Sequence, residues 1–248
     1  MSTEIRPKFL ILLVSALVPL GMTIIFNSNL NISDKIQFFM AVSTFLAVFV
    51  ALFGKKAWEY INRPLLHIKF KLAPPDCHKT KKQGGNVSFP VYYFRFLVEN
   101  IGKTQAEGCE IVLERISIQN EQGNFIEYKN YTPVNLKWTG SRNPYERTIQ
   151  PERGIYCDLG RIHHPDYSYQ SIYVNITEKE KKVNKFAIAL APYEYYYSQW
   201  DSLTPGKYQL VVSVYSRNAK KVTRKFDLTW SGNWKDEDKD MFKELVIA

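Results

Sequence analysis

Two long apolar stretches near the N-terminus dominate the pattern of hydrophobic and polar positions. Residues 9–26 read FLILLVSALVPLGMTIIF and residues 36–53 read IQFFMAVSTFLAVFVALF, and neither stretch contains a charged residue. A helix of either length spans roughly 27 Å, which is close to the thickness of the hydrocarbon core of a bilayer. Neither stretch alternates with the period of a strand or carries a polar stripe. The pattern therefore predicts two transmembrane helices.

The short connection between the two stretches, residues 27–35, is polar and reads NSNLNISDK, which predicts a tight helical hairpin. Basic residues flank the outer ends of this hairpin: Arg6, Lys8, Lys55, Lys56 and Arg63. The connection holds one lysine, so the positive-inside rule predicts a multi-pass protein of the cell inner membrane with both its N-terminus and its C-terminal domain in the cytoplasm. A cleaved signal peptide is the alternative for the first stretch, although no small-residue cleavage site follows it.

The second helix is expected to continue through residues 55–62 and to end before Pro64, because the residue before a proline disfavours helical conformation. Within this helix Ser43, Ala47 and Ala51 recur every four residues, and small residues at this spacing let two helices approach closely. Either the hairpin packs on itself at this stripe, or copies of the chain form a homo-oligomer. Residues 1–63 are thus expected to form the membrane unit.

From residue 64 to residue 248 the pattern changes to short segments in which apolar and polar residues alternate. Strands are expected at 65–72, 90–100, 108–120, 124–128, 147–149, 154–160, 170–177, 184–191, 208–216 and 222–230, with turn residues between them. Residues 76–88 read as a basic loop. Short alternating strands at regular spacing predict an antiparallel β-sandwich or barrel. A short closing helix, capped by Asn233, is expected to present Met241, Phe242 and Leu245 on one face, either packed on the sheets or bound to a partner.

Three segments of this polar domain resemble bacterial immunoglobulin-like domains. The first is FRFLVENIGKTQAEGCEIVL, the second is RTIQPERGIYCDLG and the third is LTPGKYQLVVSVYSRN. The residues that match the pattern of that family are Asn100, Gly102, Ala106, Ile149, Pro151, Gly154, Pro205, Gly206 and Tyr208. The resemblance implies an Ig-like antiparallel β-sandwich in which Tyr208 closes a corner. It implies a fold and no particular activity.

The composition and the motifs of the chain limit the kinds of protein and of reaction that we expect. The chain has 248 residues and a net charge of +9, and its apolar content excludes an intrinsically disordered protein. Its three cysteines, Cys77, Cys109 and Cys157, are widely spaced, which offers no disulfide framework and suits a reducing compartment. No phosphate-binding loop, zinc motif or hydrolase motif occurs. We therefore expect no enzymatic activity, no metal and no cofactor.

An aromatic tract, APYEYYYSQW at residues 191–200, is the most unusual stretch of the domain. In a strand Tyr193, Tyr195 and Tyr197 would share one face, while Trp200 would lie on the other. Aromatic faces stack on nucleobases and cations hold phosphates, so this tract and nearby arginines form the candidate ligand site: Tyr193, Tyr195, Tyr197, Trp200, Arg142, Arg147 and Arg161. The alternatives are an aromatic core layer beneath a solvated basic surface, and attraction of the positive charge to the anionic inner leaflet.

The whole architecture resembles the two-transmembrane, β-rich effectors of bacterial anti-phage signalling systems. That resemblance implies a cytosolic β-domain that binds a cyclic nucleotide, and helices that oligomerise and perturb the membrane. The expected partners are the lipid bilayer, further copies of the chain and a cyclic nucleotide, with no duplex nucleic acid. The alternative is a membrane-tethered Ig-like module that binds a protein and no small molecule.

Overall fold

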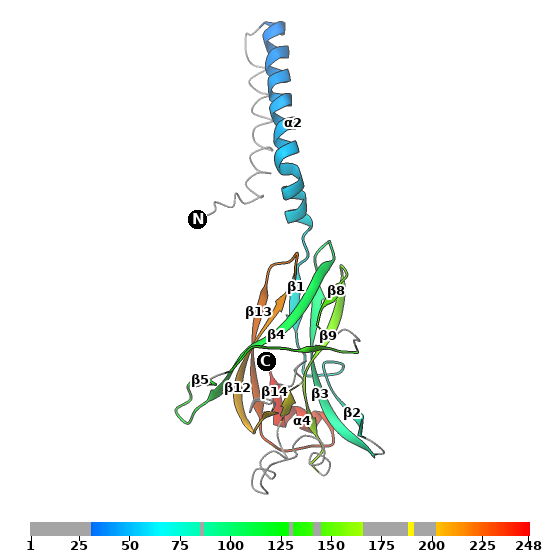
Figure 1. Cartoon of the computed structure of the whole chain (residues 1–248). Helices are drawn as coiled ribbons and strands as arrows, with labels where there is room; N and C mark the ends of the chain where they lie inside the picture. The colour runs from blue at the N-terminus through cyan, green and yellow to red at the C-terminus, as the bar shows by residue number, and fades with distance from the viewer. Residues whose placement is uncertain (1–30, 85–86, 129–130, 141–144, 166–187, 191–201) are drawn as a thin grey trace. The chain divides into compact units, whose positions relative to one another are not determined.

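The fold is described from a computed structural model for residues 31–84, 87–128, 131–140, 145–165, 188–190 and 202–248 (Figure 1). The chain divides into two compact units, Met1–Arg63 and Pro64–Ala248. The first predicted span, residues 9–26, and the predicted strand at 170–177 lie outside the described residues. The second unit is called the β-domain below.

The described part of the first unit is one helix, α2, at Ile32–Asn62. Its mean hydropathy reaches 2.3 over its most apolar window, so it is long and apolar enough to span a membrane. It begins at Ile32, inside the predicted polar connection, because Asn31 is extended and the charge of Asp34 in the first turn suits a helix N-terminus. It ends at Asn62, before the extended Arg63, which confirms the predicted continuation toward Pro64.

The β-domain contains two antiparallel sheets, each with seven described strands (Figure 1). The first sheet has the order β1-β3-β9-β10-β11, with β2 also paired to β3 and β7 to β9. Its strands are β1 (Leu66–Lys69), β2 (Cys77–Gly84), β3 (Val87–Asn100), β7 (Lys137–Trp138), β9 (Arg153–His163), β10 (Ile188–Leu190) and β11 (Ser202–Leu203). The prediction of an antiparallel, mostly β structure in this domain is confirmed.

The second sheet has the order β14-β13-β12-β4-β5, and β6 and β8 also pair with β4. Its strands are β4 (Ala106–Gln119), β5 (Phe125–Glu127), β6 (Val134–Asn135), β8 (Arg147–Ile149), β12 (Gly206–Tyr215), β13 (Val222–Trp230) and β14 (Leu245–Ile247). A short helix, α4 (Asp238–Glu244), precedes β14.

One hydrophobic core joins the two sheets. Alternate residues of β3, Tyr92, Phe94 and Phe96, are fully buried, as the period of a strand requires. The rings of Phe96 from the first sheet and Phe226 from β13 of the second stack with centroids 4.4 Å apart. Burying one such side chain contributes about 1.5–3 kcal/mol relative to leaving it in water, so these facing rings hold the sheets together.

Residues 77–84 form a strand, and the prediction of a loop over 76–88 was wrong. The strand β2 pairs with β3 over eight positions, from Cys77 opposite Phe94 to Gly84 opposite Val87. The sequence of β2 does not alternate between apolar and polar residues, so it lacks the pattern of a half-buried strand. Its hydrogen bonds to one neighbour, β3, make it a strand. A polar strand is favoured at the edge of a sheet, where charge discourages further pairing.

Two side chains fix the turns that the sequence pattern indicates. The buried amide of Asn100 accepts hydrogen bonds at its Oδ1 from the N–H groups of Leu65 and Gly102, and its Nδ2 donates to the carbonyls of Thr104 and Ile149. The hydroxyl of Tyr208 donates to the carbonyl of Thr204 at 2.8 Å, as in a tyrosine corner.

The C-terminal helix is shorter than the sequence predicts. Helix α4 begins at Asp238 after Glu237, so Asn233 is not its cap. The Nδ2 of Asn233 lies 3.3 Å from a carboxylate oxygen of Glu244 instead. The ring of Trp234 packs edge-on against Tyr92 at 5.0 Å, and this contact holds the residues before α4 out of a helix. The helix is followed by β14, which extends the second sheet.

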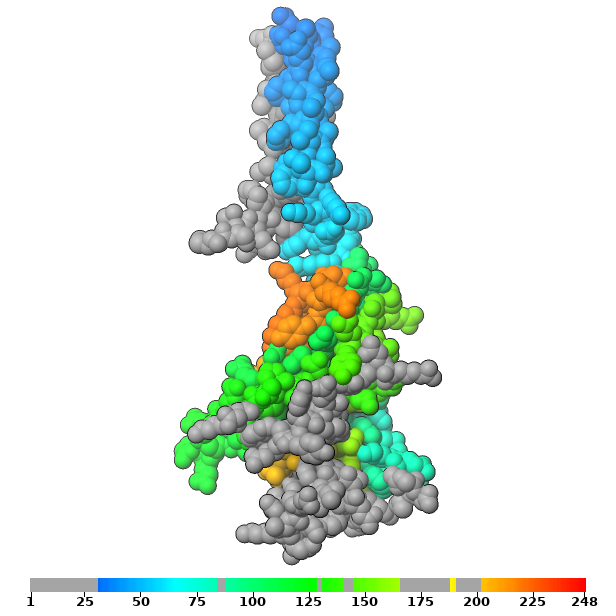
Figure 2. Space-filling view, in the orientation of Figure 1, coloured from blue at the N-terminus to red at the C-terminus, as the bar shows by residue number. Residues whose placement is uncertain are grey.

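Strand β13 carries a charged outer edge. Its residues 222–226 pair with β12 alone, whereas its last residues also pair with β14. Thr223, Arg224 and Lys225 are exposed there, within the orange surface in Figure 2. The Arg224 guanidinium donates to the carbonyl of Ile68 in β1 at 2.8 Å, so it also joins the sheets at this edge.

Candidate functional site

Basic side chains gather on the face of the first sheet that is opposite the core. In the registers of β2, β3 and β9, Lys82 lies opposite Phe89, and His163 lies opposite Val91. Arg161 lies opposite Tyr93 on the same face, since alternate residues of a strand point to one side. We call Lys82, Arg161 and His163 the basic cluster. It brings together residues from strands that are far apart in the sequence.

The basic cluster has a buried centre and partly exposed cations. His163 retains 4% exposure, whereas Lys82 and Arg161 are half-buried. The Nε–H of Arg161 donates to Nε2 of His163 at 2.8 Å. The ring of Phe89, itself buried, lies 5.5 Å from the imidazole between centroids and forms an apolar wall. The basic cluster is thus a group of polar side chains set against an aromatic ring.

The cations of the basic cluster make no ion pair within the described residues, and the carboxylate that interacts electrostatically with Arg161 is that of Asp158. Burial, and then the charges of Arg161 and Lys82, lower the pKa of His163 to about 4, so its imidazole is neutral at pH 7. Burial and the charge of Arg161 also lower the pKa of Lys82. Within the described part of the chain, neither cation lies within ion-pair distance of a carboxylate. An anion bound here would relieve this repulsion.

Close pairing of β9 with β10 depends on Gly160, which directly precedes Arg161. A Cβ at this position would lie 2.7 Å from the carbonyl oxygen of Ala189 and 3.3 Å from Cα of Leu190. Both contacts are with backbone, which has little room to move. The glycine therefore lets β10 lie directly beside the basic cluster, with Ala189 opposite Arg161.

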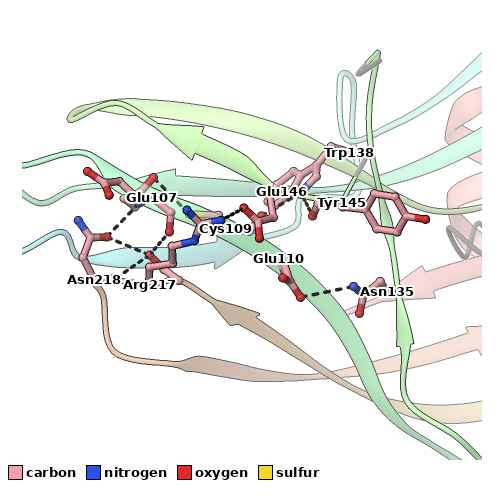
Figure 3. Close-up of polar contacts among 11 residues, drawn as sticks. Glu107, Cys109, Glu110, Asn135, Trp138, Tyr145, Glu146, Arg217 and Asn218 are labelled. Atoms are coloured by element: carbon pink, nitrogen blue, oxygen red, sulfur yellow. Dashed lines mark hydrogen bonds and ion pairs between the residues drawn. The ribbon is translucent and has the colours of Figure 1, made fainter. Parts of the chain in front are cut away.

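A second candidate surface is an open groove of about 610 Å³ along β4 and β12 (Figure 3). Its lining includes three glutamates and one arginine: Glu110, Glu114, Glu146 and Arg217. Figure 3 shows Arg217 extending toward Glu146, with which it forms an ion pair, and Glu110 near Asn135. We call it the acidic groove.

The acidic groove is organised by hydrogen bonds within its own walls. Burial opposes ionisation of Glu114, but hydrogen bonds from Lys221, Tyr215 and Ser213 outweigh it and lower the pKa of this carboxyl. Arg217 crosses β4 above Gly108, where a Cβ would lie 2.6 Å from its Nε. Gly108 also has a positive φ of 55°, which disfavours any other residue.

The structure places the predicted ligand residues as follows. Arg161 belongs to the basic cluster in β9, while Arg147 lies in β8 and lines a polar hollow with Glu107, Glu146 and Arg217. The two arginines are therefore in different sheets with different neighbours. Arg142, Tyr193, Tyr195, Tyr197 and Trp200 lie outside the described residues. The predicted helix-packing residues, Ser43, Ala47 and Ala51, are exposed on α2.

Two members of the basic cluster were missed by sequence reasoning. Lys82 falls in the predicted loop at 76–88, and the sequence analysis predicts no ligand role for His163. Its position two residues after Arg161 in an alternating strand was the available signal, since it puts both side chains on one face. The lysine is identified only when β2 pairs with β3.

Other chemistry has little support in the described residues. No group of three or more His, Cys, Asp or Glu side chains there could hold a metal ion. All three cysteines are free and buried. Burial raises the pKa of Cys77 to about 12 and that of Cys109 to about 11, so neither thiol ionises near neutral pH.

No protein-family model and no curated protein matches the chain. Solved structures that it resembles include the X-ray structure of Northeast Structural Genomics Consortium target SoR45. The match has 12% identity and a TM-score of 0.27, and it covers 71% of this chain and 94% of that chain. At this TM-score the likeness carries no weight for fold or function.

Proposed function

We propose that this protein is a membrane-anchored, non-enzymatic sensor or effector whose β-domain binds an anionic ligand at the basic cluster. The observation that carries the proposal is the pair of half-buried cations, Lys82 and Arg161, that lie on one face of the first sheet, repel each other and have no carboxylate within ion-pair distance among the described residues. Phosphate groups are the anions that such paired cations hold best. A cyclic nucleotide is the specific ligand that we propose.

The finer architecture belongs to the same proposal. The bonds made by Asn100 and Tyr208 and the two facing sheets support an Ig-like sandwich for the β-domain. The apolar length of α2 supports one membrane-spanning helix. The apolar stretch at 9–26 and the flanking basic residues are the sequence features that favour a hairpin in the inner membrane with both the N-terminus and the β-domain cytoplasmic.

Helix α2 has two contrasting faces that support homo-oligomerisation. Phe45, Phe49 and Phe53 stack along one side, with successive ring centroids 6.2 and 4.9 Å apart. At 100° per residue, Ser43 and Ala47 fall on the opposite side, where helices of neighbouring copies can approach closely. Ligand binding by the β-domain would then change how the helices associate and so perturb the bilayer in anti-phage defence.

The test uses the full chain in liposomes with a trapped dye. A panel of cyclic mono- and dinucleotides is assayed for binding by calorimetry and for dye release. We expect one member to bind and to cause leakage, and Lys82→Gln and Arg161→Gln each to weaken binding at least tenfold, as loss of a charged hydrogen bond predicts. Lys220→Gln, at an exposed turn, is the matched control. Absence of binding across the panel contradicts the nucleotide proposal.

The acidic groove favours a second candidate function, a membrane-tethered module that binds a protein. Glu114 and Glu146 are paired with Lys221 and Arg217, so Glu110, which makes no ion pair within the described residues, would attract a basic segment of a partner. Affinity purification from detergent would then recover a stoichiometric partner, and Glu110→Lys would release it. Recovery of the chain as a homo-oligomer with no other protein contradicts this alternative.

A further inference from the structure

We propose that His163 donates a ligand hydrogen bond from its buried Nδ1–H, and that with Lys82 and Arg161 it forms a group of donors that selects a phosphoryl group. This inference rests on the proposed function, since it concerns the same basic cluster. It adds that the recognised chemical group is a phosphoryl group and that His163 recognises it.

The tautomer of His163 follows from its contact with Arg161. A guanidinium has five N–H donors and no acceptor. Because the Nε–H of Arg161 lies 2.8 Å from Nε2 of His163, Nε2 must accept the bond with its lone pair. A neutral imidazole then carries its proton on Nδ1. The low pKa of this side chain, set by burial and by the two cations, keeps it neutral at physiological pH.

The Nδ1–H that results has no partner. Nδ1 of His163 is buried and makes no hydrogen bond, although the residue is only 4% exposed. A buried polar group without a partner is unfavourable, so such groups in folded proteins call for an explanation. Lys82 and Arg161 offer donors alone, so neither supplies the acceptor that this N–H lacks.

A group of donors discriminates among ligands. The oxygens of one phosphoryl group can accept separately from the three side chains, and the group brings the negative charge that the two cations require. A carbonyl or hydroxyl oxygen supplies no such charge, and an amine repeats the chemistry already present. Lys82 and Arg161 keep part of their surface exposed, whereas His163 is buried. The group could come from a soluble phosphate ester or from a lipid headgroup.

Two substitutions separate the two nitrogens of the ring. In His163→Asn the amide nitrogen can occupy the position of Nδ1 and keep the donor, while the acceptor for Arg161 is lost. In His163→Gln the amide oxygen can occupy the position of Nε2 and keep that acceptor, while the donor is lost. We expect the full chain in detergent to bind inorganic pyrophosphate, His163→Gln to bind it about 10- to 100-fold more weakly, and His163→Asn to stay within a few-fold of wild type.

A spectroscopic readout guards against a merely structural effect. In histidine-labelled full chain, nitrogen NMR should show the His163 proton on Nδ1, and pyrophosphate should shift this resonance. The signal is assigned by its loss in His163→Asn, and thermal unfolding verifies that both variants are folded. Equal affinity of wild type and His163→Gln, or a proton on Nε2, overturns the proposal.

Further measurements distinguish a soluble phosphate ester from a lipid headgroup as the source of the phosphoryl group. They also show whether a negative result rejects the proposed function or the role of His163. Nanodiscs with and without phosphatidylglycerol show whether a lipid headgroup displaces pyrophosphate. Either outcome, displacement or none, supports the inference provided that His163→Gln weakens phosphoryl binding. Pyrophosphate binding without any cyclic nucleotide binding rejects the proposed function and retains the inference. Cyclic nucleotide binding that is unchanged in His163→Gln retains the proposed function and rejects the inference about His163.

Discussion

At the scale of single residues, the β-domain depends on a few polar groups that are fully used. Asn100 is the clearest case, because both the oxygen and the nitrogen of its buried amide make two hydrogen bonds. It thereby ties the start of β1, the turn after β3 and the end of β8 to one point. Only an amide supplies two acceptor positions and two donors in this geometry.

Asn100→Ala is therefore expected to lower the free energy of unfolding by about 3 kcal/mol or more, since two N–H groups and two carbonyls lose their partner. Asn120→Ala is the matched control. Its Oδ1 accepts one hydrogen bond, from the N–H of Asn124, in the turn before β5. Denaturant unfolding followed by tryptophan fluorescence measures both. Equal, small losses would show that the four bonds of Asn100 do not act together.

The pH dependence of stability gives a second test at this scale. The pKa of His163 falls from 6.5 in the unfolded chain to about 4 in the fold, so the unfolded state takes up this proton first as the pH drops. Stability from this residue is present above pH 6.5 and is lost as the pH falls toward 4, by about 3 kcal/mol in total. The groups that face it are Arg161, Lys82 and Phe89, of which two are permanent cations in this range.

Unfolding of wild type and His163→Asn is compared between pH 7 and 4. As the pH falls, the free energy of unfolding should decrease more for wild type than for His163→Asn, because asparagine does not titrate. His67→Asn, an exposed position on β1, serves as the control. Parallel curves for wild type and His163→Asn would contradict the lowered pKa.

At the scale of elements, strand β9 shows how backbone contact differs from side-chain contact. A Cβ at Gly160 meets the backbone of β10, whereas a Cβ at Gly154 meets the side chains of Leu97 and Glu99. Side chains can rotate away, but a paired strand must move as a whole. Gly154 should therefore tolerate substitution by a larger residue better than Gly160 does.

Gly160→Ala should lower the free energy of unfolding by about 1–3 kcal/mol, as for other overpacked sites, and should weaken pyrophosphate binding because Arg161 is displaced. Gly154→Ala, the control in the same strand, should cost less and leave binding unchanged. Denaturant unfolding and calorimetry measure the two effects. A larger loss for Gly154→Ala would show that the approach of β10 is not the constraint.

Sequence predicts the elements whose own residues carry the pattern. Helix α2 and the long strands β3, β4, β12 and β13 alternate or remain apolar over many residues, so local pattern and tertiary burial agree. Strand β2 escapes prediction because only its hydrogen bonds to β3 make it a strand. The same reason limits the site: Arg161 is predicted from its charge and His163 lies two residues along the same strand, but the place of Lys82 beside them depends on pairing between distant segments.

At the scale of the whole molecule, α2 is the described element that is long and apolar enough to span a membrane. Most of its length is apolar and none of its residues is buried within the protein. Phe49 lies within the apolar stretch 36–53, and Trp58 lies in the last turns. If α2 spans a bilayer, lipid covers Phe49 and Trp58 reaches the interface.

Phe49→Lys is expected to disfavour membrane insertion by up to about 3 kcal/mol, which is the cost of a lysine at the centre of a span. Trp58→Lys should insert normally, because a lysine near the end of a helix reaches the interface. Alkaline carbonate extraction of cell membranes measures the retained fraction. Complete retention of Phe49→Lys would argue that α2 alone does not hold the chain in the bilayer.

The charged outer edge of β13 has a consequence for encounters between copies of the chain. A second copy that added its own strand there would meet the exposed charges of Lys225 and Arg224, the latter bonded to Ile68. End-to-end growth into a cross-β fibre is disfavoured for this reason. Copies of the chain can then collide and separate without joining their sheets at this edge.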